Sequence, residues 1–84
     1  MFNIQNIRAS FPILNEKIRG NKLVYLDNGA STQKPTEVIE REKYFYEHQY
    51  ANIHRGVHFL SQIGTDLYER SRQAIQLFIN AKHD

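Results

Sequence analysis

Two short polar segments contain the residues whose types and spacing could take part in chemistry, residues 27–35 and 52–58. In the first, the small residues Gly29 and Ala30 would let the backbone approach a ligand closely, and N–H groups exposed there could bind a carboxylate or a phosphate. The competing interpretation is a tight turn at Asn28-Gly29. Spacing alone favours the turn.

The second segment places two histidines and an arginine around a glycine. His54 and Arg55 could serve as a proton donor, a ring-stacking group or an anion clamp. His54 and His58 stand four residues apart, a spacing that can chelate a metal on a helix. Gly56 and the β-branched Val57 between them make a helix doubtful, so we expect no metal site. The alternative is a polar connection in which the histidines only form local hydrogen bonds.

Other chemistry has little support in the sequence. The chain has no cysteine, so it can form neither a disulfide nor a thiolate metal site. Ser31 lacks the G-x-S-x-G context of a nucleophile, and Asp27 has no second carboxylate nearby. Neither glycine-rich phosphate-binding motif is present. No residue is therefore assigned as catalytic.

Composition and charge argue against further classes of function and location. The net charge is +2, but lysine and arginine alternate with acidic residues, as in residues 40–43. A nucleic-acid binder concentrates its basic residues, so we expect no nucleic-acid partner. No apolar run is long enough to cross a membrane, and the first residues lack the pattern of a signal peptide. A cytoplasmic location is the expectation.

The elements that must position these segments follow from local signals. A first helix is predicted over residues 4–10, with Asn3 as its N-cap and Phe11-Pro12 as its end. Residues 19–22 indicate a turn, and the apolar run 23–26 predicts a strand. Residues 27–34 then form a loop.

Two amphipathic helices are expected after this loop. Pro35 suits the first turn of the first one, and the second begins near Leu60 or Ser61, after a break around Gly56. The first has a partly apolar face made of Val38, Ile39, Glu42, Phe45, Tyr46 and Gln49. The second has a clean stripe made of Leu60, Ile63, Gly64, Leu67, Tyr68, Ser71, Ala74, Ile75 and Phe78. One strand cannot close a sheet, so residues 1–84 are expected to be an incomplete α/β segment, mostly helical with one or two short strands.

Three strings in order closely resemble the opening of Suf-type cysteine desulfurases, which belong to the class V aminotransferase group of fold-type I enzymes that use pyridoxal 5'-phosphate. They are Phe11-Pro12-Ile13-Leu14, then residues 25–35 (YLDNGASTQKP), then residues 54–61 (HRGVHFLS). The resemblance covers nearly the whole chain. The last two strings separate this branch from the other cysteine desulfurase branch, which shares only the Tyr-Leu-Asp-Asn start.

The resemblance implies a function. The family takes sulfur from L-cysteine, leaves a persulfide on an enzyme cysteine, releases L-alanine and supplies iron–sulfur cluster assembly. It acts as a homodimer with a sulfur-acceptor protein. By position, Gly29 and Ala30 map to the turn near the substrate carboxylate, and His54 and Arg55 to a pair close to the active site and dimer interface. The family often has alanine at the position of Gly29.

The resemblance also implies what these residues lack. The family's cofactor-binding lysine, ring-stacking histidine, pyridine-pairing aspartate and persulfide cysteine all lie further along its chains. We therefore assign no cofactor-binding residue here and expect the 84-residue chain to be inactive alone. Two alternatives remain open: a non-catalytic helical interaction module, and another class V aminotransferase-like enzyme such as a selenocysteine lyase.

Overall fold

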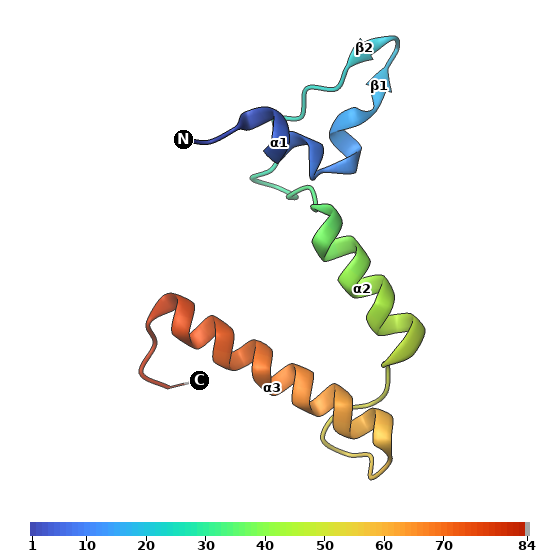
Figure 1. Ribbon diagram of the computed structural model, residues 1–84, viewed down its shortest axis with the longest axis vertical. Helices are drawn as coiled ribbons and strands as arrows, with labels where there is room; N and C mark the ends of the chain where they lie inside the picture. The colour runs from blue at the N-terminus through green and yellow to red at the C-terminus, as the bar shows by residue number, and fades with distance from the viewer. Residues whose placement is uncertain (84) are drawn as a thin grey trace. The chain divides into compact units, whose positions relative to one another are not determined.

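The structure is a computed structural model that describes residues 1–83. Figure 1 shows the elements in chain order: α1 (Ile4–Ala9), the 3-10 helix η1 (Pro12–Asn15), β1 (Lys17–Ile18), β2 (Asn21–Lys22), α2 (Thr36–His48) and α3 (Phe59–Ile79). The chain divides into two compact units, one made of residues 1–43 and one that begins at residue 44. Each unit is described by itself.

Helix α1 begins and ends where local signals predict. The Asn3 side chain accepts a hydrogen bond from the Asn6 N–H at 3.1 Å, which confirms it as the N-cap. The helix ends at Ala9, one residue before the predicted end, with Ser10 as its C-cap. Pro12 begins η1 directly afterwards, which the sequence analysis did not predict.

A two-residue hairpin follows η1. Lys17 pairs with Lys22 and Ile18 with Asn21 in an antiparallel register. The turn residues Arg19 and Gly20 have φ values of 53° and 81°. Positive φ at both central residues is typical of a type I′ turn, whose twist matches that of the paired strands. The turn predicted over residues 19–22 is confirmed at Arg19 and Gly20. Asn21 and Lys22 instead form the second of two short strands, whose number agrees with the expected one or two but whose place was not predicted.

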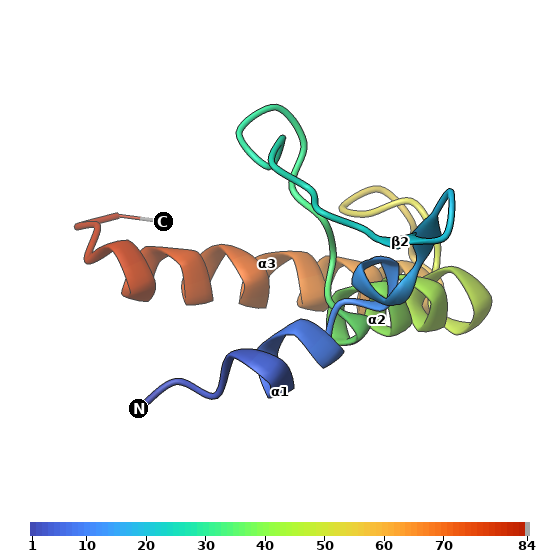
Figure 2. The same cartoon turned by 90° about the horizontal axis from the view of Figure 1, so that it is seen from above.

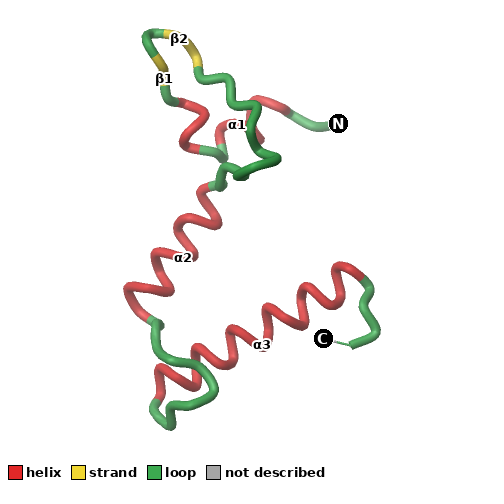
Figure 3. The backbone as a smooth tube through the Cα atoms, turned by 180° about the vertical axis from the view of Figure 1, so that it is seen from behind, coloured by secondary structure: helices red, strands yellow, loops and turns green. Residues whose placement is uncertain are grey.

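The predicted strand over residues 23–26 is wrong. Leu23 extends the hairpin by one hydrogen bond, from its N–H to the Glu16 carbonyl at 3.3 Å, but the residues after it have no strand assignment. Figure 3 shows strand only in the hairpin. The run has the side chains of a strand, but a strand also needs a neighbouring strand to pair with, and residues 1–83 provide none here. Val24 and Leu26 are consequently 74% and 91% exposed.

Helix α2 begins at Thr36, so Pro35 precedes the first turn instead of lying in it. The Pro35 carbonyl accepts hydrogen bonds from the N–H groups of Val38 and Ile39, at 3.1 and 3.2 Å. In the first unit, the Thr36 N–H and hydroxyl both donate to the Ser10 carbonyl, at 2.7 and 3.2 Å. These bonds connect the start of α2 to the end of α1.

Helix α3 begins at Phe59, one residue before the predicted start, and ends with Asn80 as a C-cap in the left-handed conformation. The N–H of Ala81 bonds to the Gln76 carbonyl at 2.9 Å, as at many helix ends closed by a left-handed residue. The segment before α3 is drawn in yellow in Figure 1 and Figure 2, and Figure 1 shows that it lies beside the first turns of this helix.

The described residues contain no hydrophobic core. None of the hydrophobic residues in 1–83 is buried, and Ser61 and Gly64 are the buried residues of α3. The predicted apolar stripe of α3 is therefore largely uncovered, with Ile75 59% and Phe78 90% exposed. Its large apolar area would be stabilising only if another layer removed it from water.

Candidate functional site

The polar loop after residue 26 is held by bonds within itself. The N–H groups of Ala30 and Ser31 both donate to the Asp27 carbonyl, at 3.0 and 3.1 Å. The Tyr25 hydroxyl donates to the Ser31 carbonyl at 2.6 Å. The Asn28 side chain accepts from the N–H of Gln33 at 3.1 Å. This loop is therefore an ordered turn, which was the interpretation that spacing favoured.

The hydrogen bonds of this loop affect how Gly29 and Ala30 could contact a ligand. The Ala30 N–H, which could have bound a carboxylate, is bonded to Asp27. A Cβ built on Gly29 meets nothing within 4 Å, and the φ of Gly29 is not positive. The position therefore tolerates alanine, and Gly29 leaves open space beside the turn.

The second segment is anchored to α3 by Ser61, whose residue exposure is 0%. The Ser61 hydroxyl donates to the Asn52 carbonyl at 2.5 Å and accepts from the Gly56 N–H at 3.1 Å. A buried hydroxyl is stable only when it is hydrogen bonded, and here it is used as donor and acceptor together. Ser61 thus holds the loop at two points, Asn52 and Gly56.

Glycine and histidine complete the anchor. His58 is the N-cap of α3, and its Nδ1 accepts a hydrogen bond from the Ser61 N–H at 3.3 Å. A Cβ on Gly56 would lie 2.6 Å from both Cβ and Oγ of Ser61, and a Cβ on Gly64 would lie 3.2 Å from Cγ2 of Ile53. Glycine is required at position 56 because the loop and helix approach closely there, whereas a Cβ at position 64 would need Ile53 to shift by a few tenths of an ångström.

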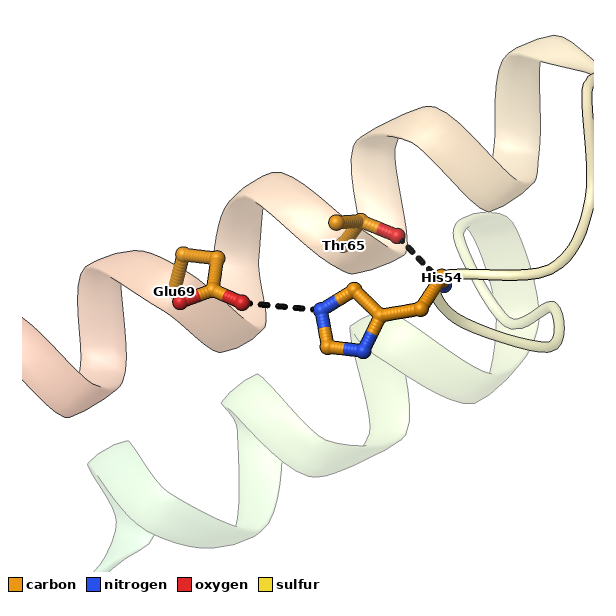
Figure 4. A network of polar contacts seen from close by, with 3 residues as sticks. All are labelled: His54, Thr65 and Glu69. Carbon is orange, nitrogen blue, oxygen red and sulfur yellow. Dashed lines mark hydrogen bonds and ion pairs between the residues drawn. The ribbon is translucent and has the colours of Figure 1, made fainter.

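His54 makes the other contacts with α3, as Figure 4 shows. Its N–H donates to the Thr65 hydroxyl at 2.8 Å, and its Nε2 lies 2.8 Å from Oε1 of Glu69. The ring of Tyr68 meets the imidazole edge to face, with 5.4 Å between centroids. The His54 and Glu69 side chains are 46% and 45% exposed, so solvent weakens their pairing.

Arg55 is exposed beside this anchored backbone. Within residues 1–83, its guanidinium has no hydrogen bond or ion pair. A planar guanidinium with available donors is suited to paired bonds with a carboxylate. Of the four predicted site residues, Arg55 is therefore the one whose side chain stays available for a ligand.

The structure brings His54 and Arg55 together in the second unit and Gly29 and Ala30 together in the first. It also adds three residues that the sequence analysis did not assign to the site: Ser61, Thr65 and Glu69. They stand four residues apart, and this spacing places them on one face of a helix. The spacing of these three polar residues was the signal in the sequence that could have identified them as one group.

The described residues contain neither a metal-binding group of side chains nor a helix that could span a membrane. No group of three or more histidine, cysteine, aspartate or glutamate side chains in residues 1–83 is placed to hold a metal ion. His54 and His58 instead bond to Glu69 and Ser61, which is the local hydrogen bonding considered as the alternative to a metal site. No helix in the same residues is long and apolar enough to span a membrane.

Comparison with known proteins gives consistent matches. The family profile described as Aminotransferase class-V matches residues 24–84. "Probable cysteine desulfurase 1" of Mycobacterium leprae (strain TN) is 49% identical over 81 residues, which are 96% of this chain and 13% of that protein. "Cysteine desulfurase" of Escherichia coli (strain K12) is 46% identical over 82 residues, 98% of this chain and 20% of that protein. "Cysteine desulfurase" of Synechococcus elongatus is 46% identical over 80 residues, which are 95% of this chain and 13% of that protein.

The chain thus spans a fifth or less of the length of these curated relatives. The family profile covers both the loop that contains Gly29 and the anchored segment around Arg55. Almost every residue of the chain is aligned with each relative at an identity well above the level at which a family is shared. The chain therefore belongs to the aminotransferase class V family.

Proposed function

We propose that these residues form the N-terminal segment of a Suf-type cysteine desulfurase with a fold-type I architecture. The complete protein would move sulfur from L-cysteine to a persulfide on an enzyme cysteine, release L-alanine and supply iron–sulfur cluster assembly. Homodimer formation, a sulfur-acceptor protein and a cytoplasmic location belong to the same proposal. The observation that carries it is an anchored loop that leaves the Arg55 guanidinium available, in a chain similar to cysteine desulfurases along its length.

In this proposal the segment contributes substrate-binding residues and no catalytic residue. Arg55 binds the carboxylate of L-cysteine through paired charge-assisted bonds, and His54 holds the loop beside it. Gly29 and Ala30 are assigned separately, as a substrate-binding turn of the first unit. The open space beside Gly29 supports a close approach, while the bonded N–H of Ala30 limits what that residue can donate.

The described residues do not fit pyridoxal 5'-phosphate as a resident group. Lys34, which lies within the first loop, donates from Nζ to the Thr32 carbonyl at 2.8 Å and is exposed. Such a lysine lacks the desolvated surroundings that activate an amine. The cofactor would supply an electron sink in the complete enzyme, and its anchoring groups are expected outside these residues. Without a cysteine, the 84 residues also cannot carry a persulfide.

The test uses a hybrid enzyme, the Escherichia coli cysteine desulfurase with its 82 matching residues replaced by this chain. We expect the hybrid to form L-alanine from L-cysteine. Arg55→Ala should strongly lower turnover at subsaturating L-cysteine by raising KM, and Arg55→Lys should restore only part of it, because lysine keeps the charge but loses the planar fork.

Steady-state alanine production decides the outcome, with cofactor occupancy checked by absorbance. An exposed arginine without a ligand would leave both variants near the unmodified hybrid, since exposed ion pairs contribute only about 0–1 kcal/mol. Equal rates in Arg55→Ala and the unmodified hybrid would therefore remove Arg55 from the site. A correctly folded, cofactor-loaded hybrid without activity would contradict the proposed function itself.

The uncovered face of α3 favours one second candidate, a helical interaction module. Ile75 and Phe78 are 59% and 90% exposed, and a partner that covered them would gain apolar contact area. A stable complex between the 84-residue chain and a separate full-length cysteine desulfurase, observed by analytical ultracentrifugation, would favour this candidate. Desulfurase activity of the hybrid that depends on Arg55 would favour the enzyme segment.

A further inference from the structure

The backbone of His54 lies in an unusual conformation, with φ at 64°. This left-handed region is unfavourable for a residue with a Cβ, and histidine occupies it far less readily than glycine. Such a conformation persists only where the surroundings hold it, and it is often found beside ligand-binding residues. Contacts around His54 must therefore hold its backbone in this conformation.

Three side chains from one face of α3 hold His54. The Thr65 hydroxyl accepts from the His54 N–H at 2.8 Å, so it acts on the backbone itself. The Glu69 carboxylate lies 2.8 Å from Nε2, and the Tyr68 ring contacts the imidazole. Thr65 and Glu69 stand one helical turn apart on α3. This one helix therefore hydrogen bonds to both the backbone and the side chain of His54 (Figure 4).

Arg55 lies between two anchored neighbours. On one side is His54, and on the other is Gly56, whose N–H donates to the buried Ser61 hydroxyl at 3.1 Å. The Arg55 side chain itself has no partner within residues 1–83. The contacts with α3 thus fix the backbone on both sides of a side chain that stays available, which is the arrangement expected of a preorganised binding residue.

We propose that Thr65 and Glu69 are positioning residues for Arg55: by holding His54 in its left-handed conformation, they direct the guanidinium toward the carboxylate of an amino-acid substrate. The inference rests on the proposed function, because it takes the carboxylate of L-cysteine as the ligand. It differs from that proposal in assigning the positioning to two residues of α3 that do not touch the ligand.

The experiment measures KM and kcat for L-cysteine in the hybrid enzyme. Thr65→Val removes the hydroxyl and keeps the shape, and Glu69→Ala removes the carboxylate. Each should raise KM about 2- to 10-fold, the equivalent of one ordinary hydrogen bond, and leave kcat within about twofold. Thr65→Ser and Glu69→Gln should restore most of the affinity, since both keep an acceptor for His54.

Asp66→Ala is the matched control. Asp66 is on the same helix and pairs with Arg70 at 3.0 Å, four residues along and exposed. Removing it deletes an acidic side chain and an ion pair of α3 without touching His54. We expect its KM to equal that of the unmodified hybrid. A rise in KM as large as that of Glu69→Ala would overturn the proposal, because the effect would then belong to helix charge or stability.

The same measurements in an Arg55→Ala background separate positioning from structure. If Thr65 and Glu69 act through Arg55, their substitutions cause no further rise in KM once Arg55 is gone. An equal rise in both backgrounds would overturn the proposal. Wild-type KM in Thr65→Val and Glu69→Ala, with Arg55→Ala impaired, would overturn this inference and leave the proposed function standing. Wild-type kinetics in Arg55→Ala would instead refute the role of Arg55, and this inference with it.

Discussion

The replacement of Gly56 by alanine tests the anchored loop most directly. The new Cβ would lie 2.6 Å from both Cβ and Oγ of Ser61 and 3.1 Å from Nε2 of His58. Ordinary contacts at such positions are 3.4–4 Å. The Ser61 atoms cannot swing away as the end of a long side chain could, because the hydroxyl is buried and bonded to Asn52 and Gly56. Loop and helix must therefore separate.

The expected cost follows from two opposing terms. Overpacking of this kind costs about 1–3 kcal/mol, and the shift also weakens the two hydrogen bonds of Ser61. Alanine reduces the conformational freedom of the unfolded loop, which returns about 0.4–1 kcal/mol. The net loss of local stability is about 1–2 kcal/mol, and it corresponds to a roughly 5- to 30-fold larger population of the opened loop.

Trypsin provides the assay, because it cleaves after Arg55 and its cleavage rate follows the population of the opened loop. In the hybrid enzyme, Gly56→Ala should raise the cleavage rate at Arg55 about 5- to 30-fold. A short peptide with the same substitution corrects for the changed residue after the cleaved bond. Gly29→Ala is the matched control, since a Cβ there meets nothing within 4 Å, and its cleavage rate at Arg55 should be unchanged.

A second substitution checks the steric cause. Ser61→Gly removes both atoms that the new Cβ would strike, at the cost of a helix glycine and the two hydrogen bonds. Adding Gly56→Ala to Ser61→Gly should then raise the cleavage rate much less than it does alone. An unchanged cleavage rate in Gly56→Ala, or an equal rise in both backgrounds, would refute the close contact between loop and helix.

Three further outcomes are expected. The 84-residue chain mixed with pyridoxal 5'-phosphate should show no stable aldimine absorbance band, and a band that borohydride fixes onto one lysine would contradict the assignment of no cofactor-binding residue. The same chain should melt broadly by circular dichroism, because its described residues bury no hydrophobic side chain, and a sharp monomeric transition would show that it folds alone. In a peptide of residues 57–83, Asn80→Gly should keep or increase helicity and Asn80→Ala should decrease it, since the φ of residue 80 is 56°; equal helicity in the two variants would argue against this cap.

Local signals determined much of the secondary structure. Asn3 before α1 and Phe11-Pro12 after it act through bonds and steric contacts with their immediate neighbours, so the sequence alone predicts them. The same holds for the turn at Arg19-Gly20 and for α3, whose apolar period is independent of what covers it. The strand over residues 23–26 failed for the converse reason, because a strand exists only where another strand accepts its hydrogen bonds.

For the site, the sequence by itself determined which residues are present, including the His54-Arg55 pair and the absence of cysteine, and the motifs that lead to the class V family. Only the tertiary structure decided how these residues are held. The left-handed φ of His54, the buried hydroxyl of Ser61 and the grip of Thr65 and Glu69 arise when a loop folds back on the helix that follows it. Contacts across such a fold depend on distances in space, and residue spacing along the chain does not specify them.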